Sequence, residues 1–200
     1  PEPTPDTGMA STGSGTPAPP EPPAATPAPL PEIAPDLIAA LDAMAEADFA
    51  TAEEALTTAD NEARDTPLAS RVAAWKQLLH YRKGYADLET EAVASVSSGD
   101  EYDTPEGRIA IVESVPGSFK WVAKGEHYDL PHVPELARDA IVADWLDERP
   151  ANDLFVGAYL ITKRKPDVAA AQAAWEKAAS GGADASLLLP LLEDPILVKP

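Results

Sequence analysis

The stretch from Gly99 to Pro131 constrains the fold most, because it is the one place where β-strand chemistry replaces helix chemistry. Thr104–Gly107 and Val115–Ser118 each carry proline at the second of four positions with glycine close behind, as tight turns do. Around these turns lie three segments of strand-forming composition: Arg108–Glu113, Phe119–Ala123 and His127–Asp129. The pattern predicts an antiparallel meander of three or four short strands over residues 99–131.

A meander of this size cannot bury both of its faces by itself. Helical periodicity flanks it on both sides, over residues 36–98 and 132–195, within one domain that spans 36–195. We therefore expect the apolar side chains of the strands to pack partly against helices, so that the meander is a platform with helical walls. These side chains are Ile109, Ile111, Phe119 and Trp121.

Residues 1–35 contain 12 of the 22 prolines, together with Gly, Ser, Thr and Ala. This composition cannot offset the entropy of ordering, so we expect a disordered, partly polyproline-II linker that spans on the order of 100 Å where extended. We interpret it as a tether behind a signal peptide, lipid anchor, membrane helix or upstream domain; the alternative is a remnant or a shed leader. Since the chain begins with Pro1, we expect a segment of a longer precursor or a mature form without its leader.

Helices are predicted on both sides of the platform. Before it, Asp36 is a candidate N-cap and Gly84 a candidate kink or interruption in a long helix. After it, Asn152 is a candidate N-cap of a helix in which Gly157 indicates close helix packing, and Asp167 caps the helix that follows. Three tryptophans lie on apolar helix faces and are predicted to be core residues: Trp75, Trp145 and Trp175.

Two segments resemble helical repeats. The spacing F-x-x-A-x-x-x-L-x-x-A from Phe49 resembles the second helix of a tetratricopeptide repeat, and residues 152–186 resemble a Sel1-like or tetratricopeptide unit, particularly at Ala174–Ala179. The order of hairpin, strand module, Asp129–Pro131, helix and Leu188–Asp194 also resembles a group of uncharacterised bacterial envelope-associated proteins. The resemblance implies an α+β fold, mainly α, with tetratricopeptide-like or Sel1-like hairpins enclosing the β-meander, and it implies no assigned activity.

The charge of the chain excludes two classes of partner. The formal net charge is −19, and no Lys or Arg occurs before Arg64 although twelve acidic residues do. Such a surface repels phosphate groups, so we expect no nucleic acid and no anionic membrane surface as partner. No run of side chains approaches the roughly 20 apolar residues of a membrane helix. The absence of cysteine removes disulfides, thiolate chemistry and Cys-based zinc sites.

Candidate chemistry is sparse. His127 and His132 bracket Asp129, with Glu126 adjacent, which offers imidazole and carboxylate ligands, but this spacing matches no metal motif. The sequence contains no Gly-x-Ser-x-Gly elbow, Gly-rich phosphate loop, dinucleotide fingerprint or EF-hand. We therefore predict no enzyme, and no catalytic, metal-binding or cofactor-binding residue.

Three aromatic residues of the platform are possible binding residues: Phe119, Trp121 and Tyr128. If exposed, they would form a patch able to stack on sugar or to contact a protein. The simpler expectation for Phe119 and Trp121 is that they are core residues. We predict a non-catalytic protein-interaction or scaffold module outside the cytoplasm, whether periplasmic, envelope-tethered or secreted. One alternative is a polysaccharide-binding or cell-wall-binding module on the platform. The other is a small metal-dependent hydrolase built on His127, His132 and Asp129.

Overall fold

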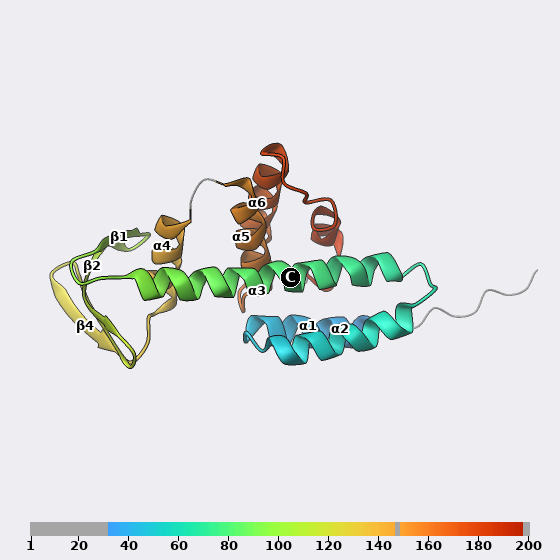
Figure 1. Ribbon diagram of the computed structural model, residues 1–200, viewed down its shortest axis with the longest axis horizontal. Coiled ribbons are helices and arrows are strands. Elements are labelled where there is room, and N and C mark those ends of the chain that lie inside the picture. The colour runs from blue at the N-terminus through green and yellow to red at the C-terminus, as the bar shows by residue number, and fades with distance from the viewer. Residues whose placement is uncertain (1–31, 147–148, 198–200) are drawn as a thin grey trace, which may run out of the picture. The chain divides into compact units, whose positions relative to one another are not determined.

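The computed structural model describes residues 32–146 and 149–197, which lie within one compact unit, Pro31–Pro200. The predicted Pro-rich tether covers residues 1–35, so nearly all of it lies outside the described residues. The described chain has a mixed α+β fold that is mainly helical (Figure 1). Its elements are α1 (Ala34–Ala45), α2 (Phe49–Ala63), α3 (Ala69–Ser95), β1 (Glu101–Thr104), β2 (Gly107–Val115), β3 (Ser118–Ala123), β4 (Glu126–Leu130), α4 (Glu135–Trp145), α5 (Pro150–Thr162), α6 (Val168–Ser180) and the 3₁₀ helix η1 (Leu189–Glu193).

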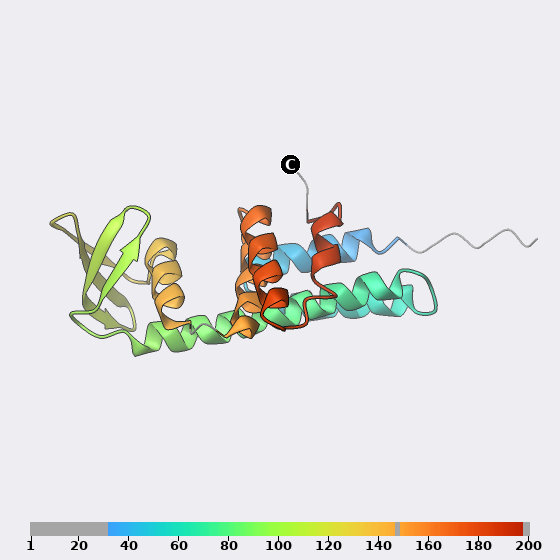
Figure 2. The ribbon, with the colours of Figure 1, turned by 90° about the horizontal axis from the view of Figure 1, so that it is seen from above.

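The long helix α3 connects the two parts of the fold. One end of it lies beside α1 and α2, its middle contacts α5, and its other end reaches α4 and the sheet (Figures 1 and 2). The predicted interruption at Gly84 is wrong, because α3 runs unbroken from Ala69 to Ser95. A Cβ atom at Gly84 would lie 2.5 Å from Cε1 of Phe155, so glycine is used here for the close approach of α5.

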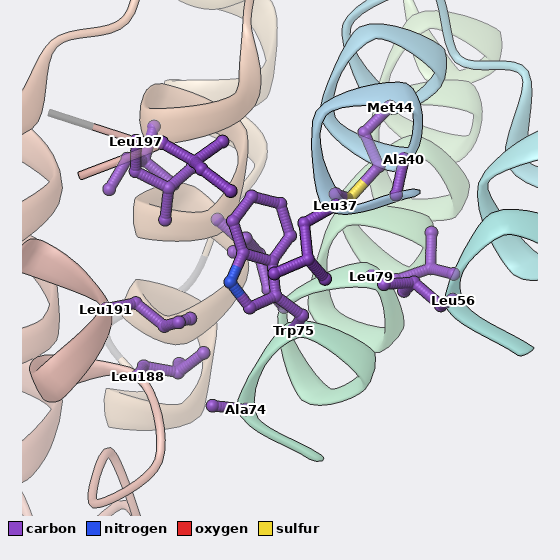
Figure 3. Close-up of a cluster of buried hydrophobic side chains, with 14 of the residues drawn as sticks. Leu37, Ala40, Met44, Leu56, Ala74, Trp75, Leu79, Leu188, Leu191 and Leu197 are labelled. Atoms are coloured by element: carbon purple, nitrogen blue, oxygen red, sulfur yellow. The ribbon is translucent and has the colours of Figure 1, made fainter. Parts of the chain in front are cut away.

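The helical cluster forms the larger core and surrounds Trp75. Figure 3 shows this indole between Leu37 of α1 and Leu188 and Leu191 of the C-terminal segment. Trp175 of α6 belongs to the same cluster, and both tryptophans are fully buried, as predicted. The buried members of the helical cluster include Ile33, Leu37, Ala40, Met44, Ala52, Leu56, Val72, Trp75, Leu78, Leu79, Leu154, Ile161, Trp175, Leu188, Leu191 and Leu197.

The sheet cluster forms the second core, at the C-terminal end of α3. As predicted, Ile109, Ile111 and Phe119 are buried there against helices, and Trp121 packs against them while staying half-buried. The buried members of the sheet cluster are Tyr85, Ala92, Val96, Ile109, Ile111, Phe119, Ala137, Ile141 and Val142. The platform therefore has helical packing on one face, from α3 and α4.

The sheet is a four-stranded antiparallel meander with the order β1-β2-β3-β4. Both predicted Pro-containing turns are two-residue hairpin loops, since Thr104 pairs with Gly107 and Val115 with Ser118. The last hairpin turns at Lys124 and Gly125, both with positive φ. Positive φ at both central residues is the type I′ geometry, which matches the twist of the adjoining strands and fixes the register of the β3–β4 hairpin.

Three local predictions are wrong. Helix α1 begins at Ala34, so Asp36 lies in its first turn and Ile33 is the N-cap residue. Helix α5 begins at Pro150, whose fixed φ suits the first helical position, so Asn152 is a buried residue inside the helix. Trp145 is the last residue of α4 and is 46% exposed, so it is not the core residue that was predicted.

Candidate functional site

The principal candidate site is a cleft of about 630 Å³ beside the sheet cluster, which we call the sheet cleft. The C-terminal half of α3 forms one wall, the β2–β3 turn forms another, and the segment between β4 and α4 forms the third. It is lined by Glu89, Thr90, Val93, Ala94, Ser114, Val115, Pro116, Gly117, Phe119, Pro131, His132, Val133 and Arg138. Three segments that are distant in sequence therefore converge on one concave surface.

The walls of the sheet cleft are mostly apolar. Phe119 forms its base and is itself part of the buried core, and Val93 and Val133 pack partly against the sheet cluster. Pro116 and Pro131 lie at the ends of strands, where a missing backbone N–H leaves no donor to satisfy. Prolines also limit the freedom of the two loops that carry them, which form two of the three walls of the cleft.

The polar end of the sheet cleft is an ion pair between two helices. Nη1 of Arg138 on α4 donates a 2.8 Å hydrogen bond to Oε1 of Glu89 on α3. Burial alone would lower the pKa of Arg138, but the hydrogen bond and charge of Glu89 outweigh it and hold this pKa above its ordinary value. Nε of Arg138 is buried, and within the described residues it has no hydrogen-bond acceptor. An unpaired buried donor of this kind costs about 1–3 kcal/mol.

A second polar group lies near this ion pair, where α3 and α5 meet. Arg82 of α3 is buried, and its guanidinium lies 5.4 Å from the ring of Phe49, 5.9 Å from that of Tyr85 and 5.4 Å from that of Tyr159. Tyr85 and Tyr159 stack with ring centroids 4.3 Å apart. Burial lowers the pKa of Arg82, but an arginine keeps its charge at neutral pH. Three aromatic rings thus hold one cation at the junction of the two cores.

Asp139 of α4 also contacts this junction, through Tyr159. Its Oδ1 accepts a 3.0 Å hydrogen bond from the hydroxyl of Tyr159. Burial raises the pKa of Asp139 above its ordinary value, more than the Tyr159 hydrogen bond lowers it. Burial and the nearby Asp139 charge likewise raise the pKa of Tyr159. A carboxyl group with a raised pKa marks many acid–base sites, but the residues that line the sheet cleft do not include Asp139. We interpret the junction as a structural support for the cleft.

The predicted binding residues occupy three different environments. Phe119 is buried, Trp121 is half-buried, and Tyr128 on β4 is 40% exposed. The rings of Trp121 and Tyr128 are stacked, with centroids 4.9 Å apart and planes inclined by 12°. The ring of Phe119 also contacts Trp121, with centroids 5.5 Å apart and planes tilted by 39°. Of the three, only Tyr128 presents a largely exposed ring, and only Phe119 lines the sheet cleft.

The histidines of the platform lie on different features. His127 pairs with Val122 and Asp129 with Lys120, so both side chains are on the sheet face opposite Trp121. His132 follows β4 and lines the sheet cleft. In the described part of the chain, no group of three or more His, Asp or Glu side chains could hold a metal ion. The structure thus offers no assembled set of ligands among the residues it describes.

Sequence reasoning missed the functional residues that depend on long-range pairing. Glu89 and Arg138 are 49 positions apart, and nothing in either helix signals the partner. Arg82 does carry a signal, because it falls three and four positions from apolar residues on the buried face of α3, Leu78, Leu79 and Tyr85. A charged residue at such a position indicates a buried cation that needs partners.

No protein-family model matches the chain, and comparisons with curated proteins and with solved structures found no match. Among the described helices, none is long and apolar enough to cross a membrane. The resemblance to tetratricopeptide and Sel1-like repeats and to envelope-associated proteins stays a prediction.

Proposed function

We propose that the chain is a non-catalytic protein-interaction module that holds an extended peptide segment of a protein partner in the sheet cleft. The observation that carries this proposal is the cleft itself, whose mostly apolar lining includes the ion pair of Glu89 and Arg138. Binding sites in proteins typically combine an apolar lining with a few placed polar groups that fix orientation. This cleft has that composition.

A peptide fits the chemistry of the cleft better than a free metabolite. Val93, Val133 and Phe119 offer contacts for an apolar side chain, and the partly exposed Arg138 side chain offers a charged donor to a backbone carbonyl or a carboxylate. The hydroxyls of Thr90 and Ser114 add two further polar groups along the same surface. An extended segment presents side chains and carbonyls alternately, which matches apolar walls with polar groups between them.

The polysaccharide alternative has weaker support. A sugar ring needs an open aromatic face, yet the Trp121 indole is half-buried, stacks on Tyr128 and also contacts Phe119. Tyr128 is the exposed ring of the three. The hydrolase alternative needs ligands that converge, whereas His127 and Asp129 lie on the outer face of the sheet and His132 lines the cleft.

The location outside the cytoplasm and the tethering role of residues 1–35 are proposals that rest on composition alone. A Pro-rich spacer of this kind would present the folded unit at a distance from its anchor. Presentation of that kind suits a module that captures a partner and performs no reaction.

The test is peptide selection followed by a variant that fills the cleft. A random peptide library is panned against the full chain, and the affinity of selected peptides is measured by calorimetry. Ala94 is exposed and lines the cleft, so Ala94→Trp should lower peptide affinity at least tenfold, or about 1.4 kcal/mol.

Ala73→Trp is the matched control, because Ala73 is an exposed alanine on the same helix and outside the cleft lining. It should leave affinity unchanged. Equal losses for both variants, or a library that yields no binder, would overturn the proposal. Binding of oligosaccharides that is lost on Trp121→Ala would favour the polysaccharide alternative instead.

A further inference from the structure

The edge strand β4 carries backbone groups with no partner in the sheet. In the β3–β4 hairpin, Ala123 pairs with Glu126 across a two-residue turn, and hydrogen-bonded pairs then alternate along an antiparallel ladder. Tyr128 and Leu130 therefore bond to β3, while the N–H and C=O groups of His127 and Asp129 point away from the sheet. β4 is the outer strand, visible in yellow at the edge of the sheet in Figure 1.

Devices that normally block an edge are scarce on β4. Four of its five residues are exposed, it contains no lysine or proline, and the irregular register of the sheet lies in β2, near Ile111. The other edge strand, β1, contacts α4. An edge that no described segment covers is a template for another strand, although the charges of Glu126 and Asp129 restrict which strand can pair with it.

We propose that β4 pairs antiparallel with β4 of a second copy of this chain, about a two-fold axis that passes beside Tyr128. In this register His127 lies opposite the partner's Asp129, and Asp129 lies opposite the partner's His127. An imidazole N–H can donate to a carboxylate in either charge state of the ring. Each of the two pairs of outward residues exchanges two backbone hydrogen bonds. The proposal is independent of the sheet cleft and of any peptide bound there.

The charges of β4 select this register over its neighbours. An axis at Asp129 would set two carboxylates opposite each other and would bring His127 against the partner's Pro131, which has no N–H to donate. An axis at His127 would align the two imidazoles and leave Asp129 opposite the partner's Gly125. Of the three registers, all of which pair the outward backbone groups, only the one with its axis at Tyr128 forms two pairs of an imidazole and a carboxylate.

The aromatic side chains support the same axis. Tyr128 stacks on Trp121 with one face of its ring, and the other face turns toward the open edge. Two Tyr128 residues would face each other as a pair without backbone hydrogen bonds between them, where side chains approach most closely. The stack would then run through Trp121, Tyr128 and the same two residues of the second copy. A second copy is favoured over an unrelated strand because β4 complements itself.

The first experiment uses the absence of cysteine from the chain. In the proposed register, Tyr128→Cys places two thiols across a pair whose Cα atoms are about 4.5 Å apart, within the range that a disulfide spans. Mild oxidation of the full chain should give a covalent dimer on a non-reducing gel. Val112→Cys on β2 is the matched control, since Val112 is 43% exposed and Tyr128 is 40% exposed. Equal cross-linking of the two variants would overturn the proposal.

The second experiment keeps Tyr128 and exchanges the charges. Sedimentation velocity of the full chain, up to about 1 mM, should show a reversible dimer. His127→Asp creates two like-charged cross-strand pairs and should weaken it about tenfold or more, whereas His127→Asp combined with Asp129→His should restore it. A wild type that is monomeric throughout, or a double variant as weak as the single one, would overturn the proposal.

Discussion

The first half of α3 packs Trp75, Leu78 and Leu79 into the helical cluster, whereas its second half packs Tyr85, Ala92 and Val96 into the sheet cluster. The first core is built almost entirely from aliphatic side chains and two tryptophans. The second is smaller and is bordered by charged and hydroxyl groups, among them the junction at Arg82. One helix therefore serves two cores of different chemistry.

The polar groups of the two regions also differ in how well they are paired. In the helical cluster, buried Asp194 accepts two 2.8 Å hydrogen bonds from Arg71, one of 3.0 Å from Trp75 and one of 3.0 Å from the amide of Ile196. Near the sheet cluster, buried nitrogens of Arg82 and Arg138 have no acceptor among the described residues. Polar groups whose hydrogen bonds are all made fix a structure, whereas donors without an acceptor remain able to bond to a ligand or to water. The difference supports the proposal that a peptide binds beside the sheet rather than at the helical cluster.

Replacement of Asp194 should give the largest effect. Asp194→Ala removes the acceptor of Arg71 and Trp75 and detaches the C-terminal segment from α3, so we expect a loss of about 3 kcal/mol in the free energy of unfolding. Urea denaturation measures it. Asp60→Ala is the control, since its ion pair with Lys76 is exposed and should contribute at most about 1 kcal/mol. Similar losses for the two variants would remove the contrast between a satisfied buried anchor and a surface pair.

Two glycines provide the next test. A Cβ atom at Gly157 would collide with the fully buried indole of Trp175, while one at Gly84 would meet the half-buried ring of Phe155. We expect Gly157→Ala to cost about 2 kcal/mol through overpacking. Gly84→Ala should cost less than half of that, because Phe155 has room to move and alanine favours helix. Thermal denaturation of both variants checks the ranking, and the reverse order would show that the sheet side is the more rigid region.

How far the sequence predicts the fold depends on the range of the interactions. The meander was predictable because Pro105, Pro116 and the glycines that follow them determine turns within four residues. Trp75 and Trp175 were predictable from helical periodicity. Trp145 shares that periodicity and yet is exposed, because α4 ends there and periodicity does not reveal where the covering elements stop.

The candidate site was less predictable than the fold. The platform residues Phe119, Trp121 and Tyr128 were expected to act together, yet Phe119 supports the cleft and Tyr128 lies at the sheet edge. The cleft depends on α3 meeting the segment between β4 and α4, a contact that no local pattern encodes. The Arg71–Asp194 pair, 123 positions apart in sequence, was hidden for the same reason.

Replacement of one arginine in each region should change the free energy of unfolding by smaller amounts. Arg71→Met leaves buried Asp194 without its cation and should cost about 2 kcal/mol. Arg82→Met keeps the apolar contacts with Phe49 and Tyr159, and no carboxylate among the described residues loses an ion pair through it. The free energy of unfolding should therefore change by no more than about 1 kcal/mol. Urea denaturation distinguishes them. A larger loss for Arg82→Met would mean that the aromatic cage stabilises the junction more than the Asp194 network stabilises the helical cluster.

The pH dependence of stability should have opposite signs in the two regions and is the smallest effect. Burial would raise the pKa of Asp194, but the hydrogen bonds from Arg71 and Trp75 outweigh it and lower this pKa. Its contribution is therefore complete above the unfolded value of about 3.9 and is lost as pH falls through the folded pKa. Burial raises the pKa of Asp139, so the folded state retains that proton longer, and stability declines as pH rises from about 3.9 through the folded pKa.

Asp139→Asn removes this decline while its amide oxygen still accepts the Tyr159 hydroxyl. Relative to wild type, the Asp139→Asn variant should therefore gain stability as pH rises from about 4 to 7. Asp194→Asn should instead lose stability relative to wild type as pH rises toward about 4, because the wild-type carboxyl group ionises at lower pH in the folded state than in the unfolded state. Urea denaturation at a series of pH values gives both differences. If both variants drift in the same direction, burial does not dominate the environment of Asp139, and the sheet side is as fully satisfied electrostatically as the helical side.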